Sequence, residues 1–214
     1  MDAEIDVPGV GWLRADWTIV APDGPLVVFA HGSGSGRRSP RNRAVAAHLQ
    51  DSGFSTLLLD LLTEVEEDRE QRGGRLRFDV DQLATRLVAA VEWIDGQVDP
   101  RPAVGYFGAS TGAAGALVAA VRQENRISAV VSRGGRPDLA GDLLPLVAAP
   151  TLLVVGGADH DVLSLNEQAL GQMRCPRRLE VVPGATHLFE EPGALDQVAG
   201  LARDWFASYL SRSV

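Results

Sequence analysis

Short apolar runs alternate with helical patterns along most of this chain, and this alternation constrains the fold more than any other feature. Strands that alternate with helices need right-handed crossover connections, and the sheets they form are mostly parallel and covered on both faces. The sequence therefore predicts a single α/β domain over residues 1–214. The apolar runs occupy residues 26–30, 55–62, 103–107, 127–132, 151–156 and 178–183, and the helical patterns occupy residues 41–53, 79–94, 112–123 and 194–210.

Two segments depart from this alternation. Residues 11–24 alternate apolar and polar side chains and end in Pro-Asp-Gly, which predicts an antiparallel edge strand. Residues 63–79 are highly charged and contain a glycine pair. Such a run predicts a solvated, mobile loop. The alternative is a loop that borders the mouth of an active site, because long loops in compact domains are often functional.

The charge balance excludes some classes of partner. The net charge is −8 and the isoelectric point is about 5.0. An acidic chain of this kind is not expected to bind nucleic acid or an anionic membrane, although Arg37, Arg38, Arg41 and Arg43 form a local basic spot.

The cysteine content and the lack of targeting signals further limit the kind of protein that this sequence can encode. A single cysteine, Cys175, excludes an internal disulfide and a multi-cysteine metal site. No apolar run approaches the roughly 18 residues of a membrane span, and the opening residues lack the pattern of a signal peptide. We therefore expect a cytoplasmic monomer or homodimer without a metal or other cofactor.

The strongest local signal is Gly108-Ala109-Ser110-Thr111-Gly112, which directly follows an apolar run and precedes a helix of small residues. In the order strand, sharp turn, helix, the pattern G-x-S-x-G indicates a nucleophilic serine on a strained elbow. Glycines are needed on both sides because the strand and the helix crowd this turn. Ser110 is therefore the candidate nucleophile.

A serine at its ordinary pKa needs a base to become a good nucleophile. Of the four histidines, His48 lies within a helical pattern, His160 lies among acidic residues, and His31 begins a glycine-rich loop. His187 follows the last apolar run on a glycine-containing loop, where strand ends converge. His187 is the candidate base.

The base needs an orienting carboxylate. Asp159 and Asp161 both follow the apolar run at 151–156, and Asp159 lies nearer its end. We take Asp159 as the acid and Asp161 as the alternative. The order Ser110, Asp159, His187 places one chemical group after each of three strands, at the edge where open α/β sheets bind ligands.

The glycine-rich loop after residues 26–30 suits an oxyanion hole. Acyl transfer places negative charge on a carbonyl oxygen, and backbone N–H groups can stabilise it. We expect these donors to be the amides of Ser33 and Thr111. A phosphate-binding loop is less well supported, because the run Gly32-Ser33-Gly34-Ser35-Gly36 lacks the Lys-Ser/Thr ending of a P-loop.

Over nearly its whole length the chain resembles the α/β-hydrolase superfamily, and within it the small, lidless dienelactone hydrolase-like group. The resemblance lies in residues 29–46, 55–63, 105–117, 154–162 and 184–195. It implies Ser110 as nucleophile, Asp159 as acid, His187 as base, and the amides of Ser33 and Thr111 as the oxyanion hole. Dienelactone hydrolases use a cysteine nucleophile, whereas this elbow carries Ser110, so an ordinary ester or thioester is the expected substrate.

The substrate site is expected to be open. The connection between the runs at 127–132 and 151–156 is too short for a cap domain. His31, Gly32 and Arg133 are the candidate substrate-binding residues, and Arg133 could meet an anionic substrate or simply lie on the surface.

The sequence thus predicts a serine hydrolase that cleaves small-molecule esters through an acyl-enzyme. Two alternatives remain, a non-catalytic binding protein with the same fold and an acyltransferase. A metal-dependent hydrolase is disfavoured because the histidines are scattered and H-E-x-x-H does not occur.

Overall fold

The computed structural model describes residues 1–210, which fold around one eight-stranded sheet in the order β1-β2-β4-β3-β5-β6-β7-β8. In this order the strands from β4 to β8 are all parallel to their neighbours. Strand β2 is antiparallel to both of its neighbours, β1 and β4. The strands are β1 (Asp2–Val7), β2 (Gly11–Thr18), β3 (Leu26–Ala30), β4 (Ser55–Leu59), β5 (Val104–Ala109), β6 (Ile127–Arg133), β7 (Thr151–Gly156) and β8 (Arg177–Val182).

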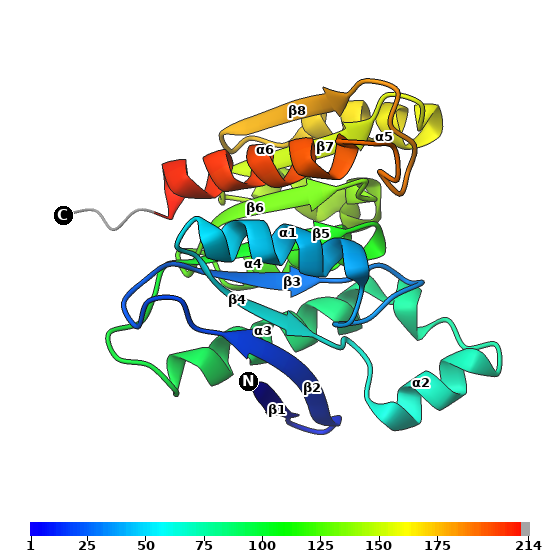
Figure 1. Cartoon of the computed structure of the whole chain (residues 1–214). Helices are drawn as coiled ribbons and strands as arrows, with labels where there is room; N and C mark the ends of the chain where they lie inside the picture. Colours follow the sequence, from blue (N-terminus) through cyan, green and yellow to red (C-terminus); the bar gives the residue numbers. More distant parts are fainter. Residues whose placement is uncertain (211–214) are drawn as a thin grey trace.

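Helices cover both faces of the sheet (Figure 1). Helices α1 and α6 pack together on one face, while α3 and α4 pack together on the other, where α5 also lies. The helices are α1 (Pro40–Asp51), α2 (Glu64–Gln71), α3 (Val80–Asp95), α4 (Thr111–Arg122), α5 (His160–Gln172) and α6 (Ala194–Tyr209), with 3₁₀ segments η1 (Leu76–Phe78) and η2 (Pro137–Leu146).

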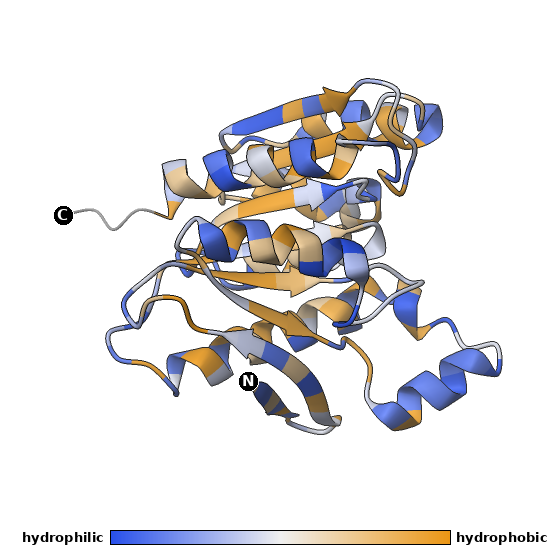
Figure 2. Cartoon of the chain, in the orientation of Figure 1, coloured by the Kyte–Doolittle hydropathy of each residue, from blue (hydrophilic) through white to orange (hydrophobic). Residues whose placement is uncertain are grey.

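The core follows directly from the apolar runs. Every residue of β3, β4, β5 and β7 is buried, as expected for strands covered on both faces. Figure 2 shows these strands mainly in the colours of hydrophobic residues. One apolar cluster lies under α3 and α4, and a second lies under α1 and α6. Residues 134–150, between β6 and β7, hold η2 and no cap domain. The predicted α/β class with a mostly parallel sheet is confirmed.

The start of the chain corrects one prediction. Residues 11–18 do form an antiparallel strand, but this strand lies between β1 and β4 and is not at the edge. The edge strand is β1, in which Ile5 and Val7 are buried and face the core. Its three acidic residues leave only a short apolar alternation, so pairing with β2 rather than local pattern decides its structure.

The structure also corrects the prediction for residues 63–79. This segment was expected to be a loop, but most of it forms α2 and η1. Helix α2 begins with a capping box, in which Thr63 accepts from the Glu66 amide and Glu66 accepts from the Thr63 amide. No residue of α2 is buried, so the helix has no apolar stripe for a sequence pattern to reveal (Figure 2).

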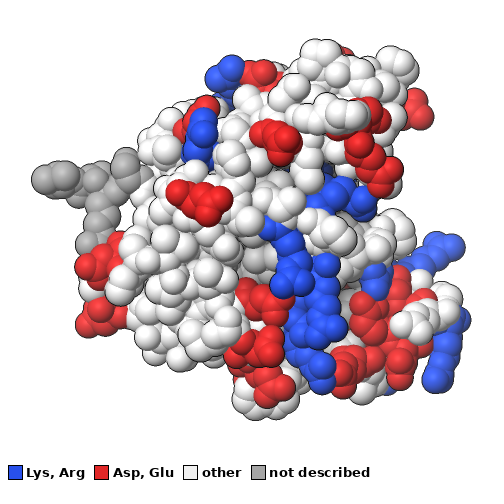
Figure 3. Space-filling model, viewed as in Figure 1, with Lys and Arg blue, Asp and Glu red and all other residues white. Residues whose placement is uncertain are grey.

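Charged side chains are unevenly spread over the face that carries α1. Figure 3 shows basic side chains gathered in a band across this face, with acidic side chains on both sides. Of the four arginines in the expected basic spot, Arg37 is buried and paired with Asp16 and Asp60, whereas Arg38 and Arg43 are exposed. The net positive charge of the spot is therefore smaller than the sequence indicates.

Candidate active site

Ser110 occupies the turn between β5 and α4 with φ of 51° and ψ of −123°. A non-glycine residue in this region carries strain of about 1–3 kcal/mol. The flanking glycines make the turn possible. A Cβ atom at Gly108 would lie 2.4 Å from the Ala113 Cα, and one at Gly112 would lie 2.4 Å from the His31 carbonyl oxygen. The turn leaves Ser110 half-buried at the carboxyl edge of the sheet.

His187 and Asp159 come together from different loops. Asp159 follows β7 as the N-cap residue of α5, and His187 lies in the loop between β8 and α6. The Nδ1 atom of His187 is 2.7 Å from Oδ2 of Asp159. With Nδ1–H donated to the carboxylate, Nε2 is left as a proton acceptor. Asp161, the alternative, is exposed in the first turn of α5, so Asp159 is the carboxylate that contacts His187.

The segment Arg133–Gly134 lies between Ser110 and the His187 loop. The Ser110 amide donates to the Arg133 carbonyl at 3.3 Å, and a Cβ atom at Gly134 would lie 3.5 Å from Nδ1 of His187. Within the described residues, His187 is hydrogen-bonded to Asp159 but not to Ser110. The hydrogen bond between a nucleophile and its base is often long in the absence of substrate and tightens when substrate binds. Ser110 and His187 therefore border the same small region.

The loop after β3 runs directly beside the elbow. A Cβ atom at Gly32 would lie only 3.0 Å from the Ser110 Cβ, so this residue must be very small. The Gly32 carbonyl accepts from Nδ1 of His31 at 2.9 Å and from the Ser35 amide at 3.1 Å. In a trans peptide the N–H points opposite to the C=O, so these bonds fix the direction of the Ser33 N–H. Ser33 and Thr111 line the same small hollow.

His31 supports this loop from beneath. It was predicted to contact the substrate, but its ring is buried and both nitrogens are engaged. Nδ1 donates to the Gly32 carbonyl, and Nε2 accepts from the Leu61 amide at 3.0 Å. Burial lowers the pKa of His31 below its ordinary value of 6.5. The ring is thus neutral and orients the peptide that carries the Ser33 amide.

This arrangement predicts an acid-sensitive fold. Below about pH 6.5 the unfolded His31 takes up a proton that the folded protein excludes, so the free energy of unfolding should fall as the pH decreases toward the lowered pKa of the folded state. The limiting slope for one proton is about 1.4 kcal/mol per pH unit. Urea denaturation between pH 5 and pH 8 measures it. His31→Asn should show a shallower slope than wild type, and His48→Asn is the control. Equal slopes in wild type and His31→Asn would contradict this assignment.

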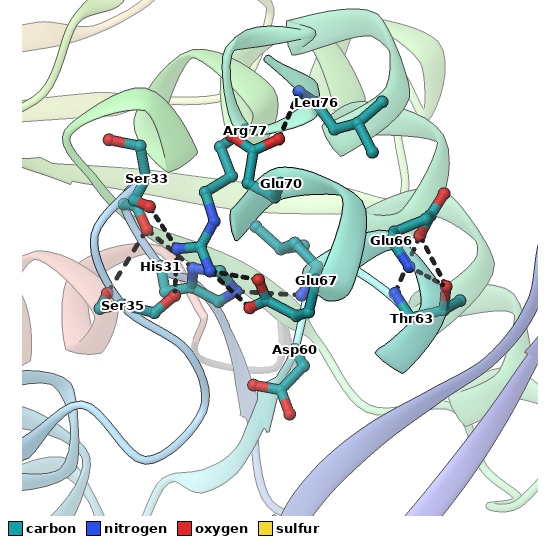
Figure 4. Close-up of polar contacts among 12 residues, drawn as sticks. His31, Ser33, Ser35, Asp60, Thr63, Glu66, Glu67, Glu70, Leu76 and Arg77 are labelled. Carbon is teal, nitrogen blue, oxygen red and sulfur yellow. Dashed lines mark hydrogen bonds and ion pairs between the residues drawn. The ribbon is translucent and has the colours of Figure 1, made fainter. Parts of the chain in front are cut away.

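Arg77 is a residue that sequence reasoning missed. Its guanidinium donates to the carbonyls of Ser33 and Ser35, the latter at 3.2 Å, and binds both carboxylate oxygens of Glu67 in α2 (Figure 4). The segment 63–79 therefore holds the backbone of the glycine-rich loop, which favours the second interpretation of that segment. No spacing in the sequence reveals this contact, because residues 33 and 77 meet only in the folded chain.

Other features of the described residues lie away from Ser110. One hollow is lined by the β1–β2 turn and α2, among them Trp12, Glu64 and Arg69. Within residues 1–210 no cluster of three potential metal ligands occurs, and no helix is long and apolar enough to cross a membrane. The polar groups around Ser110 therefore form the candidate active site.

Residues 25–150 match the model of the family described as having the α/β-hydrolase fold. The chain belongs to the α/β-hydrolase family. The match covers the strand before the glycine-rich loop, the elbow at Ser110 and the connection to β7.

Solved structures agree with this placement. The α/β hydrolase shares 52% identity and a TM-score of 0.94 with the crystal structure of a dienelactone hydrolase from Anabaena variabilis, over 99% of this chain and 98% of that one. A lidless α/β serine hydrolase from Xanthomonas campestris has a TM-score of 0.77 at 20% identity, over 100% and 96% of the two chains, and shows likeness of fold alone. The predicted resemblance to the dienelactone hydrolase-like group is confirmed.

A curated relative is much longer than this α/β hydrolase. A protein of Mycobacterium tuberculosis named as a candidate phosphoribosyl transferase is 56% identical over 195 residues. Those residues cover 90% of this chain but 43% of the relative. The chain therefore spans less than half the length of that protein.

Proposed function

We propose that this protein is a serine hydrolase that cleaves small carboxylic esters or thioesters through an acyl-enzyme on Ser110. The observation that carries the proposal is the 2.7 Å contact between His187 and Asp159, at the same sheet edge as the strained Ser110 elbow. A histidine oriented in this way presents Nε2 toward a neighbouring hydroxyl.

The proposed reaction has two halves. In the first, His187 takes the Ser110 proton as Oγ attacks the ester carbonyl, and the amides of Ser33 and Thr111 stabilise the negative oxygen. His187 then gives its proton to the leaving alcohol or thiol. In the second half, water attacks the acyl-enzyme with His187 again as base, and Ser110 is regenerated. Each oxyanion donor is worth roughly 3–4 kcal/mol in such reactions.

Support for an ester or thioester also comes from the surroundings of the site. The connection 134–150 carries only η2, so no cap covers the elbow. An uncapped, open site suits small or flexible acyl groups. The phosphoribosyl transferase name of the mycobacterial relative is not transferred to this chain, because the matched region is 43% of that protein.

A fluorophosphonate probe tests this proposal without requiring the natural substrate. Such a probe reacts when an activated serine displaces fluoride from phosphorus and forms a covalent bond. We expect intact mass spectrometry to show one probe per chain, and peptide mapping to place it on Ser110.

Ser110→Ala should abolish labelling, whereas Ser208→Ala, on the exposed face of α6, should label like wild type. Absence of labelling in correctly folded wild-type protein would favour the non-catalytic alternative and would contradict the proposed function.

A further inference from the structure

Arg133, at the end of β6, has a buried guanidinium that lacks an acidic partner. The residue is 8% exposed, and its Nε and Nη1 atoms have no hydrogen-bond partner. Its single polar side-chain contact is from Nη2 to Oδ1 of Asn42, at 3.4 Å. Among residues 1–210, every other strongly buried arginine is paired with a carboxylate: Arg37 with Asp16 and Asp60, and Arg86 with Glu66.

An unpaired charge of this kind is costly to bury. Desolvation, together with repulsion from Arg41, lowers the pKa of Arg133 to about 10, so the guanidinium is still charged near neutral pH. A chain folds around such a group only if the rest of the structure compensates the cost. An arriving anion would remove the cost, which makes the guanidinium a ready anion receptor.

The guanidinium lies between the elbow and the start of α1. Arg133 pairs with Ala109 across the sheet, and its carbonyl accepts the Ser110 amide. Its side chain reaches Asn42, the third residue of α1, whose N-cap is Ser39. The N-terminus of a helix carries partial positive charge, which attracts anions. In α1 the Asn42 amide already donates to the Ser39 hydroxyl and Pro40 has no N–H, so the helix contributes this charge rather than a row of open donors.

Arg41 adds a second positive charge at the same place. It occupies the first turn of α1 and pairs with Glu190 at 3.1 Å, in the loop that also carries His187. Glu190 is 65% exposed in its side chain, and it contacts Arg41 and not Arg133. The basic band in Figure 3 crosses this face of the molecule. Glu190 offsets much of the Arg41 charge, so the positive charge beside the candidate nucleophile comes mainly from Arg133 and the start of α1.

We propose that Arg133, Arg41 and the N-terminus of α1 form a binding site for an oxyanion, a carboxylate or a phosphate, carried by the ester that Ser110 cleaves. This inference rests on the proposed function and names its substrate class. The Ser110 amide donates to the Arg133 carbonyl at 3.3 Å, so the two residues are neighbours and one small substrate could reach both side chains. The planar fork of Arg133 suits two-point binding of either anion.

Binding is measured first, in a form that needs no turnover. Succinate and inorganic phosphate are titrated by calorimetry into the Ser110→Ala protein. We expect at least one of them to bind at a single site, and the tighter of the two identifies the oxyanion as carboxylate or phosphate. Adding Arg133→Met should weaken that binding by about 10-fold or more, the effect of losing hydrogen bonds to a charged group.

Arg43→Met is the matched control, because it removes an exposed charge from the same helix. It should change the affinity less than twofold. Arg133→Lys keeps the charge without the fork and provides a second variant if Arg133→Met does not fold. It should bind the anion more weakly than wild type. Failure of both anions to bind, or equal losses in Arg133→Met and Arg43→Met, would overturn the proposal.

Kinetics then connect the site to catalysis. p-Nitrophenyl hemisuccinate and p-nitrophenyl butyrate have acyl chains of equal length, but only the first carries a carboxylate. The ratio of their kcat/KM values should fall by about 10-fold in Arg133→Met. An unchanged ratio would overturn the anionic substrate class. Loss of hydrolysis with retained, Arg133-dependent anion binding would instead contradict the proposed function and leave the anion site standing.

Discussion

Replacing Ser110 with alanine is expected to lower kcat/KM for p-nitrophenyl acetate by on the order of 10⁴- to 10⁶-fold. The change removes only Oγ, the atom proposed to attack the ester carbonyl. Alanine tolerates the φ of 51° no worse than serine does, so the elbow should keep its shape. Initial rates of p-nitrophenol release, with the uncatalysed rate subtracted, measure the effect.

Two checks separate loss of chemistry from loss of structure. The thermal unfolding midpoint of Ser110→Ala should match wild type, because no buried contact is removed. Ser208→Ala should retain wild-type kinetics. If Ser110→Ala kept more than a few per cent of the activity, then the acyl-enzyme route through Ser110 would be excluded.

The second large effect is expected at the carboxylate. Asp159→Asn should reduce kcat by about 10⁴-fold, because an amide at this position can hold His187 in the wrong tautomer and cannot stabilise the imidazolium. The carboxylate is only 2.7 Å from Nδ1 of His187, so the loss of its charge acts directly on the base. The measurement is kcat for p-nitrophenyl acetate at saturating substrate.

Asp161→Asn is the matched control, two residues away on the same helix. Asp161 is exposed and lies in the first turn of α5, where its charge interacts with the helix terminus alone. Its replacement should change kcat less than about threefold, within the range expected for loss of a single helix-dipole interaction. A larger loss in Asp161→Asn than in Asp159→Asn would exchange the two roles.

The central strands could be predicted because burial leaves a strong local pattern. The strands β3 and β7 coincide with their apolar runs, and β5 and β6 differ from theirs by one or two residues at the ends. The predictions were wrong for the segments with weak local patterns. Strand β1 depends on its partner β2, and α2 has no buried side chain. Strand β1 is stabilised by backbone pairing with β2, and α2 is stabilised by its capping box, so neither needs a local apolar pattern.

In the candidate site, too, some features could be predicted from the local sequence and others depend on tertiary contacts. The elbow glycines are dictated locally, because a side chain at Gly108 or Gly112 would collide with the neighbouring helix or loop backbone. The choice of Asp159 over Asp161 could be argued from its position at the end of a strand, and the contact with His187 agrees. The part played by Arg77 could not be foreseen, because it depends on where α2 and η1 settle against the glycine-rich loop.

The sequence by itself determined the α/β layering and the elbow at Ser110, because both follow from periodicity and from steric limits acting over a few residues. Only the tertiary structure decided that His31 supports the glycine-rich loop from beneath and that Arg133 is buried without an acidic partner. Those two outcomes depend on which groups surround a side chain after folding. Burial and pairing are properties of contacts between distant segments, and a linear pattern carries little information about them.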